Sequence, residues 1–192
     1  MSYNGRLLKI EEWKPDPSAV PGGEELEALA EILHATVHAG ASVSFILPFS
    51  LEEAREFWLT RVLPSVVTGG RCVLLARSGS AITGTVQLDL AMPPNQQHRA
   101  EIAKLLVHPH ARRRGIGRAL MEAAEDVARS AGRTLLTLDT RTGDSAEPLY
   151  RSMGYLTAGI IPNYARDSAS PTLHATTFMY KELSKPLDAG RD

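Results

Sequence analysis

The sequence predicts a single α/β domain in which helices flank a mixed, largely antiparallel sheet. Three observations lead to this prediction. Apolar runs of strand length recur along the chain, segments with helical apolar spacing separate several of them, and residues 99–138 contain a strand, helix, strand unit. The length of 192 residues suits one domain, and 43% hydrophobic with 22% charged residues is typical of a globular protein. We expect the domain over residues 1–183 and a disordered tail over 184–192.

The first expected strand and the first expected helix are separated by a segment whose composition favours neither strand nor helix. Residues 6–13 are typical of a strand, and the prolines and glycines of residues 15–23 then interrupt regular structure. Apolar residues at helical spacing follow over residues 24–39, and Gly40 stands where a helix commonly stops. The sequence therefore predicts a strand, a loop and an amphipathic helix.

A second helix and a hairpin come next. Ser50 and Glu53 have the spacing of a capping box, in which each side chain pairs with a backbone N–H at the helix start. Pro64 is expected to bend or end this helix, because proline has no N–H to donate. The runs 71–77 and 81–91 flank a Ser-Gly-Ser turn, which predicts two antiparallel strands.

The second half of the chain places a glycine-containing loop between a strand and a helix. Apolar patterning and glycine or proline stops set the limits of each element. The expected elements are a strand over 99–107, a helix from Ile116 to just before Gly132, a strand over 135–138, a helix over about 145–152, and strands near 155–161 and 174–182, with a loop over 162–173.

Charge and composition exclude several classes of protein. The formal net charge of -1 argues against general nucleic-acid binding, which requires a broad basic surface. No apolar run approaches the length of a membrane span, and the N-terminus lacks a basic region followed by an apolar stretch. The single cysteine, Cys72, lies in an apolar run and is expected in the core, so no intrachain disulfide can form. We expect a cytoplasmic protein that binds neither nucleic acid nor membrane.

The loop before the helix at Ile116 has the features of an anion site. Its glycines let a ligand approach the backbone, the helix start presents N–H groups and about half a positive charge, and four arginines add full charges. A solvated basic helix start is the alternative. A nucleotide triphosphate loop is excluded because no Gly-Lys-Ser/Thr ending is present, and Leu120 replaces the third glycine of a dinucleotide fingerprint. The residues concerned are Arg112, Arg113, Arg114, Gly115, Ile116, Gly117 and Arg118.

The motifs on either side of this loop resemble those of the GNAT family of N-acetyltransferases. The strand 101–109 followed by Arg112-x-x-Gly115-x-Gly117 is similar to the family's acetyl-CoA motif, and residues 146–155 are similar to its second acetyl-CoA segment. The likeness covers most of the chain. Residues 36–45, 99–101 and 138–140 resemble more narrowly the tabtoxin-resistance acetyltransferases.

The resemblance implies acetyl-CoA as co-substrate and assigns roles to further residues. It implies that strand 101–109 splays from its parallel neighbour, so that amides near Leu105, Leu106 and Val107 hold the pantetheine arm and the thioester oxygen. It also implies that Tyr150 is the acid that protonates the leaving thiolate, whose conjugate thiol has a pKa of about 8.5. Packing of an aromatic ring next to Leu149 is the alternative role for Tyr150.

Two carboxylates are candidates for accepting the proton of the attacking amine. An alkyl ammonium has a pKa of about 10, so only about one molecule in a thousand is nucleophilic at pH 7. Glu101 begins one strand and Asp139 ends its expected parallel neighbour, which would place both near the acetyl group. Carboxyls with a pKa of about 4 are weak bases, so we favour a relay through water and leave open which residue is the principal base.

The histidine pairs do not predict a metal site. His34 and His38 are four apart on a helix, but Ala35 occupies the position of the zincin glutamate. The resemblance places the stretch 36–45 beside the acceptor pocket, so His38, Ser42 and Phe45 are candidates for substrate binding.

These observations favour an N-acetyltransferase that acetylates a small amine by direct attack in a ternary complex. The acceptor would be an amino-acid-like molecule, a toxin or an antibiotic. Two alternatives stay open: acetylation of a protein N-terminus or lysine, and a regulatory domain that binds acyl-CoA without chemistry. The joint presence of Glu101, Asp139 and Tyr150 argues against the regulatory domain. A homodimer through the late strand near 174–183 also stays open.

Overall fold

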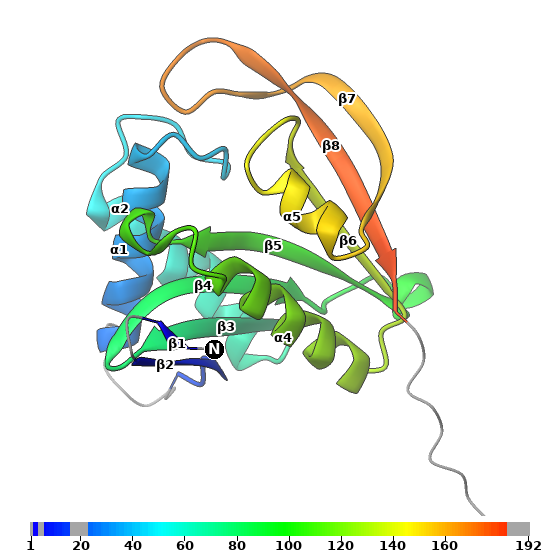
Figure 1. The fold of residues 1–192 in the computed structure, drawn as a ribbon, viewed down its shortest axis with the longest axis horizontal. Coiled ribbons are helices and arrows are strands. Elements are labelled where there is room, and N and C mark those ends of the chain that lie inside the picture. The colour runs from blue at the N-terminus through cyan, green and yellow to red at the C-terminus, as the bar shows by residue number, and fades with distance from the viewer. Residues whose placement is uncertain (1, 4–5, 16–22, 184–192) are drawn as a thin grey trace, which may run out of the picture.

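The computed structural model describes residues 2–3, 6–15 and 23–183 of the chain. One twisted sheet runs through this part, with α1 and α2 on one side and α4 and α5 on the other (Figure 1). The expected loop through Pro17 and Pro21 and the expected disordered tail from Ser184 lie outside the described residues.

The sheet has eight strands in the order β1-β2-β3-β4-β5-β6-β8-β7. All neighbouring pairs are antiparallel except β5 and β6, which are parallel. This confirms the predicted α/β fold with a largely antiparallel sheet. The strands are β1 Ser2–Tyr3, β2 Arg6–Glu12, β3 Arg71–Ser78, β4 Ala81–Asp89, β5 Arg99–Val107, β6 Leu135–Arg141, β7 Leu156–Arg166 and β8 Leu173–Glu182.

The helices follow the predicted order. The capping box is present, since Ser50 Oγ accepts the Glu53 N–H at 3.1 Å and Ser50 N donates to Glu53 Oε2 at 2.7 Å. No described helix is long and apolar enough to cross a membrane. The α-helices are α1 Glu24–His38, α2 Leu51–Glu56, α3 Leu63–Val67, α4 Ile116–Ser130 and α5 Glu147–Ser152, and the shorter elements are the π-helical η1 Phe57–Val62 and the 3₁₀ turns η2 Pro94–Gln96 and η3 Pro109–Ala111.

Pro64 does not end the second helix. The chain passes from α2 through the wide turn of η1 into α3, which continues to Val67. Pro64 lies at the start of α3, where a proline is tolerated because its missing N–H is not required there. Of the two outcomes expected at Pro64, a bend or an end of the helix, the end is therefore wrong, and the helical segment stops before Gly69.

The last hairpin is also longer than predicted. Residues 162–166 were expected in a loop, but they complete β7. Between Ile161 and Ala165 the register shifts, and Asn163 has φ 52, so the strand contains a bulge. Pro162 fits there because β7 is the edge strand and has no further neighbour that needs its N–H.

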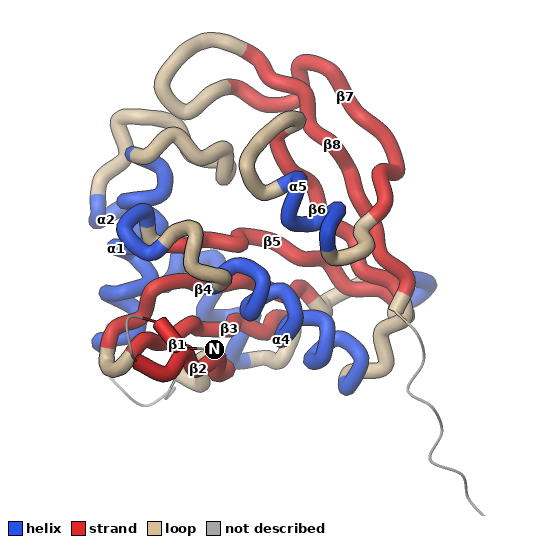
Figure 2. The backbone as a smooth tube through the Cα atoms, viewed as in Figure 1, coloured by secondary structure: helices blue, strands red, loops and turns tan. Residues whose placement is uncertain are grey.

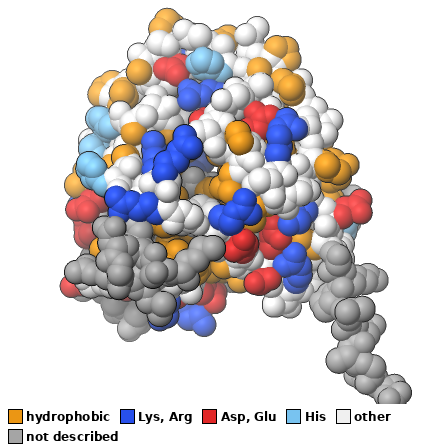
Figure 3. Space-filling view, in the orientation of Figure 1, with side chains coloured by type: hydrophobic (Ala, Val, Ile, Leu, Met, Phe, Trp, Pro, Cys, Tyr) orange, Lys and Arg blue, Asp and Glu red, His pale blue; other side chains and the backbone are white. Residues whose placement is uncertain are grey.

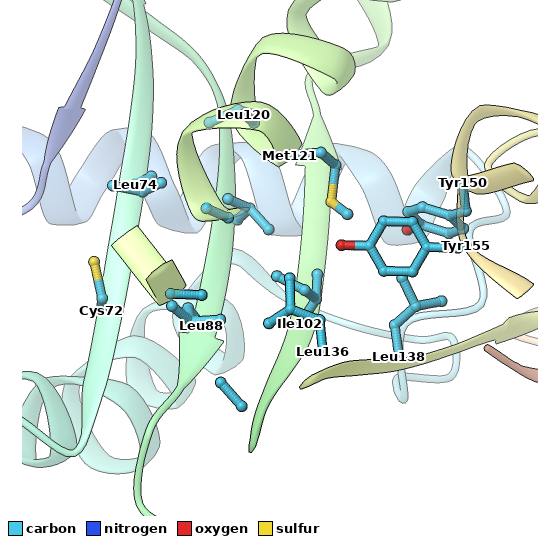
Figure 4. Close-up of a cluster of buried hydrophobic side chains, with 14 of the residues drawn as sticks. Cys72, Leu74, Leu88, Ile102, Leu120, Met121, Leu136, Leu138, Tyr150 and Tyr155 are labelled. Carbon is cyan, nitrogen blue, oxygen red and sulfur yellow. The ribbon is translucent and has the colours of Figure 1, made fainter. Parts of the chain in front are cut away.

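Hydrophobic cores lie on both faces of the sheet. Successive residues of β3 alternate between them: Leu74 belongs to the core beneath α4, and Leu75 belongs to the core beneath α1. Cys72 is buried in the first of these cores, as predicted, and burial raises the pKa of its thiol to about 12. Figure 4 shows this core, which extends from Cys72 at one end to Tyr150 at the other.

Candidate active site

A cavity of about 650 Å³ lies where β5 and β6 separate. Its walls come from β5, from the start of α4, from the end of β6 with the turn that follows, from α5 and from the loop after α1. Figure 2 shows that the loops joining these elements gather at the same end of the sheet. The lining residues are Thr36, 39–44, 102–105, Val107, 111–113, 115–118, 139–141, 144–146, 148–150 and Ser152.

The separation of β5 from β6 opens this cavity. The two strands pair only from Arg99 to Glu101, opposite residues 135–137. Beyond that point β6 continues to pair with β8, whereas β5 continues to pair with β4 (Figure 1). The splay implied by the family resemblance is therefore present, and it leaves the edge of β5 after Glu101 without a strand partner on the side of β6.

A bulge in β5 decides which of its side chains reach the cavity. Lys104 and Leu105 lie opposite the single residue Val86, and Lys104 has φ 51. The extra residue reverses the alternation, so Ile102 packs beneath α4 but Leu106 packs beneath α1.

The bulge separates the three residues expected to hold the pantetheine arm. Leu105 and Val107 line the cavity. Leu106 does not line it: its side chain is buried in the other core and its backbone pairs with Thr85.

The basic loop forms the wall at the start of α4. Gly115 has φ 78 and precedes the helix, and Arg113 also has a positive φ of 62. Arg112, Arg113 and Arg118 line the cavity, whereas Arg114 is not among its lining residues. Lys and Arg side chains are visible on the face of the molecule that carries α4 and α5 (Figure 3). The loop therefore presents positive charge to the cavity, as an anion site requires.

Hydrogen bonds fix the orientation of this wall. Arg118 donates to Ser152 Oγ at 2.6 Å and thereby ties α4 to α5. The Ala119 N–H donates to Gly115 O at 3.0 Å and closes the first helical turn. The N–H groups of Ile116 and Gly117 precede this closure, where an α-helix lacks internal acceptors, and both residues line the cavity.

Gly117 stands at a point of close packing. A Cβ at this position would lie 3.3 Å from Leu149 Cδ2 and 3.9 Å from atoms of Leu105 and Val107. All three neighbours line the cavity. A side chain here would therefore occupy space between the helix start and the cavity wall.

Tyr150 is a buried residue that brings a hydroxyl group to the site. It lies on α5, is 6% exposed and lines the cavity at the end of the core shown in Figure 4. Burial, together with the negative charges of Asp139 and Asp144, raises the pKa of its hydroxyl above the ordinary range. The hydroxyl is therefore protonated at neutral pH and can act as a hydrogen-bond donor.

The two candidate bases occupy different positions. Asp139 is exposed and lines the cavity, although it does not end its strand as predicted: β6 runs on to Arg141, and Asp139 pairs with Phe178 of β8. The longer strand forms because β8 supplies partners along its whole length. Glu101 lies outside the cavity lining, and its half-exposed carboxylate is 3.6 Å from Arg99.

The three candidate substrate-binding residues are not brought together. Ser42 lines the cavity. His38 and Phe45 do not: His38 bonds the carbonyl of Phe49 at 2.8 Å, and the Phe45 ring packs 4.6 Å from that of Phe49. Within the described part of the chain, no three His, Cys, Asp or Glu side chains are arranged to hold a metal.

Sequence reasoning missed Lys104 and Ser44, which meet across the cavity. Lys104 Nζ lies 3.3 Å from Ser44 Oγ, and both residues line the cavity. Burial lowers the pKa of the Lys104 ammonium, while the charge of Asp139 acts in the opposite direction. Simple alternation along β5 gave no signal for this contact, because it depends on the bulge.

The loop after α1 also touches the last hairpin. The Leu47 N–H donates to the carbonyl of Ser168 at 2.7 Å, and Ser168 is buried. Residues 39–44, which precede Leu47, line the cavity. This backbone bond therefore ties the loop that lines one side of the cavity to the β7–β8 hairpin.

Comparison with known proteins places this site in a family. A model of the acetyltransferase (GNAT) family matches residues 37–155, more than half of the chain. An uncharacterized N-acetyltransferase in the hisH-hisA intergenic region of Azospirillum brasilense is 29% identical over 127 residues, which cover 65% of this chain and 73% of that protein.

Two further matches agree. An IAA acetyltransferase of Azospirillum brasilense is 32% identical over 102 residues, covering 52% of this chain and 63% of that protein. The structure of yncA from Salmonella typhimurium, solved with its cofactor acetyl-CoA, superposes with a TM-score of 0.72 at 19% identity, covering 95% of this chain and 99% of that chain. At this sequence identity, the comparison with yncA shows that the two chains share a fold.

Proposed function

The chain belongs to the acetyltransferase (GNAT) family, whose co-substrate is acetyl-CoA, and we propose that it acetylates the amine of a small, amino-acid-like molecule by direct attack in a ternary complex. One observation carries the proposal. A single cavity combines a cationic helix start, the unpaired edge of β5, a buried tyrosine hydroxyl and an exposed carboxylate. These are the groups that binding a phosphorylated thioester and transferring its acetyl group require.

The residues at the start of α4 suit the phosphates of acetyl-CoA. Backbone N–H groups of the first turn and the guanidinium groups of Arg112 and Arg113 would bind these anions. The edge of β5 near Leu105 and Val107 leads from there into the cavity, where its amides would hold the pantetheine arm and the thioester oxygen. The acetyl group would then lie in the splay between β5 and β6.

Asp139 is the carboxylate that fits removal of the amine proton. The acceptor must be neutral to attack, and an alkyl ammonium with a pKa of about 10 is almost fully protonated at pH 7. Because Asp139 is exposed at the cavity wall, it can take the proton through an ordered water, as the relay interpretation predicts. The position of Glu101 outside the lining makes it the weaker candidate.

Tyr150 fits the role of acid on the thiolate. Its raised pKa keeps the hydroxyl protonated, so it can donate a hydrogen bond to the sulfur as negative charge develops there. Transfer of the proton then neutralises the leaving group. The buried position orients the hydroxyl, since the ring packs 6.0 Å from that of Tyr155.

The bond between Leu47 and Ser168 favours a small acceptor. It ties the loop after α1, whose residues 39–44 line the cavity, to the β7–β8 hairpin, and a loop held in place on this side leaves less room for an extended peptide. The narrower resemblance of residues 36–45 to the tabtoxin-resistance acetyltransferases supports the same class, an amino-acid-like toxin or antibiotic. Acetylation of a protein N-terminus or lysine is the competing function.

The test is thiol release from acetyl-CoA in the presence of a panel of small amines, with mass spectrometry to detect the gain of one acetyl group. We expect release that depends on both the protein and a small amine. Acetylation of peptides but of no small amine would favour the competing function. Thermal stabilisation by acetyl-CoA without thiol release from any acceptor would instead identify a binding domain.

A further inference from the structure

Lys104 has a conformation that local sequence preference does not explain. It is a lysine with φ 51, a value that glycine adopts freely but that strains other residues. It lies in the β5 bulge, next to the point where β5 and β6 separate. Strained residues of this kind persist where the surrounding structure holds them, and they concentrate at functional sites.

The strained backbone directs the side chain toward the loop after α1. Lys104 Nζ is 3.3 Å from Ser44 Oγ, and Ser44 also has a positive φ, of 75. Both residues line the cavity. The ammonium group is therefore held on the acceptor side of β5, whereas the arginines that suit the cofactor phosphates belong to the loop before α4.

The ammonium of Lys104 lacks a close anionic partner. No carboxylate of residues 2–3, 6–15 or 23–183 lies within ion-pairing distance of it. Arg141, another cation of the cavity wall, differs because it lies 3.5 Å from Asp144 and 3.3 Å from Asp167. A partly desolvated ammonium with only a hydroxyl partner gains most from an added carboxylate.

We propose that Lys104, assisted by the Ser44 hydroxyl, binds the carboxylate of the acceptor, so that the substrates are α-amino acids or close analogues. This inference rests on the proposed function and adds the residue that selects the substrate.

The opposite wall of the cavity supports this choice of ligand. Lys104 on β5 and Asp139 on β6 carry opposite charges on the two strands that separate. A zwitterion that places its carboxylate at Lys104 has its amino group free to lie toward Asp139, the proposed proton acceptor. In this single orientation, both the carboxylate and the amino group of an α-amino acid face a group of opposite charge.

The test compares matched acceptors with and without a carboxylate. Phenylalanine is paired with phenethylamine, and methionine with 3-(methylthio)propylamine, and thiol release gives kcat and KM for each. The wild type should have the higher kcat/KM with the acids. Lys104→Met should lower kcat/KM for the acids by about 10- to 100-fold through KM and leave the decarboxylated amines nearly unchanged, since charge-assisted hydrogen bonds have about this strength. Lys104→Arg should retain most of the preference.

A second variant keeps the bulge intact. Ser44→Ala should raise KM for the acids by about threefold, again without an effect on the decarboxylated amines. Stabilisation of each variant by acetyl-CoA, equal to that of the wild type, shows that the cofactor site is folded.

Three results would overturn the role of Lys104: a wild type that prefers the decarboxylated amines, an unchanged KM for the acids in Lys104→Met and Ser44→Ala, or an equal fall in kcat for both members of each pair. A wild type that acetylates no small amine would instead refute the proposed function itself.

Discussion

At the scale of single residues, Tyr150 combines a buried ring with a hydroxyl at the cavity. Its neighbour in the same core, Tyr155, is also buried but does not line the cavity. The pKa of both hydroxyls is raised, chiefly by burial. The two tyrosines therefore differ in access to the reacting groups more than in their packing, and they form a matched pair for mutagenesis.

We expect Tyr150→Phe to lower kcat by about 10²-fold, the effect of removing a general acid, without much change in acetyl-CoA binding. Tyr155→Phe is the control and should retain near-wild-type turnover. Because the pKa of Tyr150 is raised above its ordinary value of about 10, ionisation of this residue should not reduce activity below that pH. A kcat for Tyr150→Phe equal to that of Tyr155→Phe would remove the hydroxyl from the mechanism.

The residues of the site could be predicted from the sequence where they belong to one short, contiguous motif. The glycine loop with its arginines lies at the cavity because a strand and a helix flank it in sequence. Lys104 was not predictable, since its placement depends on one extra residue in β5 opposite Val86. The same bulge removed Leu106 from the cavity. The packing of Phe45 against Phe49 and Phe57 was not predictable either, because Phe45 lies in the loop after α1, where no regular spacing indicates which side chains meet.

At the scale of elements, α4 packs against β4 at Gly84. A Cβ on Gly84 would lie 2.9 Å from the carbonyl oxygen of Leu106, 3.1 Å from Ile116 Cγ2 and 3.2 Å from Leu120 Cδ1. The backbone of β5 cannot move away without disturbing the sheet, and Ile116 begins the helix that presents the basic loop. The position of that loop therefore depends on the absence of a side chain at Gly84.

Gly84→Ala should lower the free energy of unfolding by about 1–3 kcal/mol, the usual cost of overpacking a core. Gly159→Ala in β7 is the control, because no atom lies within 4 Å of its Cβ position, and it should be nearly neutral. Chemical denaturation of the two variants and the wild type measures both values. Equal midpoints for Gly84→Ala and the wild type would show that α4 can shift at little cost.

Element types followed from apolar periodicity, but two boundaries did not. Pro64 was expected to bend or end its helix, and Pro162 was expected in a loop. Each is accommodated by its surroundings: a wide helical turn before Pro64 and a bulged edge strand at Pro162. Proline excludes a hydrogen-bond donor, and these positions do not require one. Sequence indicates the missing donor, but only the tertiary structure shows whether a partner needs it.

At the scale of the whole molecule, the sheet has two wings joined over a short length. One wing consists of β1 to β5, and the other consists of β6, β8 and β7. The two wings are paired only through three residues of β5 and three residues of β6. The bond from Leu47 to Ser168 and the contact of Arg118 with Ser152 also connect parts that border the cavity. A ligand that contacts both wings would add to these connections and to the core that the two wings share beneath α4, and would stabilise the folded molecule as a unit.

Acetyl-CoA should accordingly raise the unfolding temperature, and at 100 times its Kd it should contribute about 2.7 kcal/mol. Gly117→Ala tests whether acetyl-CoA produces this stabilisation by binding at the start of α4. Its Cβ would meet the flexible end of Leu149 at 3.3 Å, so the unliganded variant should have nearly wild-type stability. The added methyl group would nevertheless occupy space at the helix start and raise the Kd, which thermal melts over a range of acetyl-CoA concentrations would measure. If both proteins gained the same stabilisation at every concentration, the start of α4 would not be where acetyl-CoA binds.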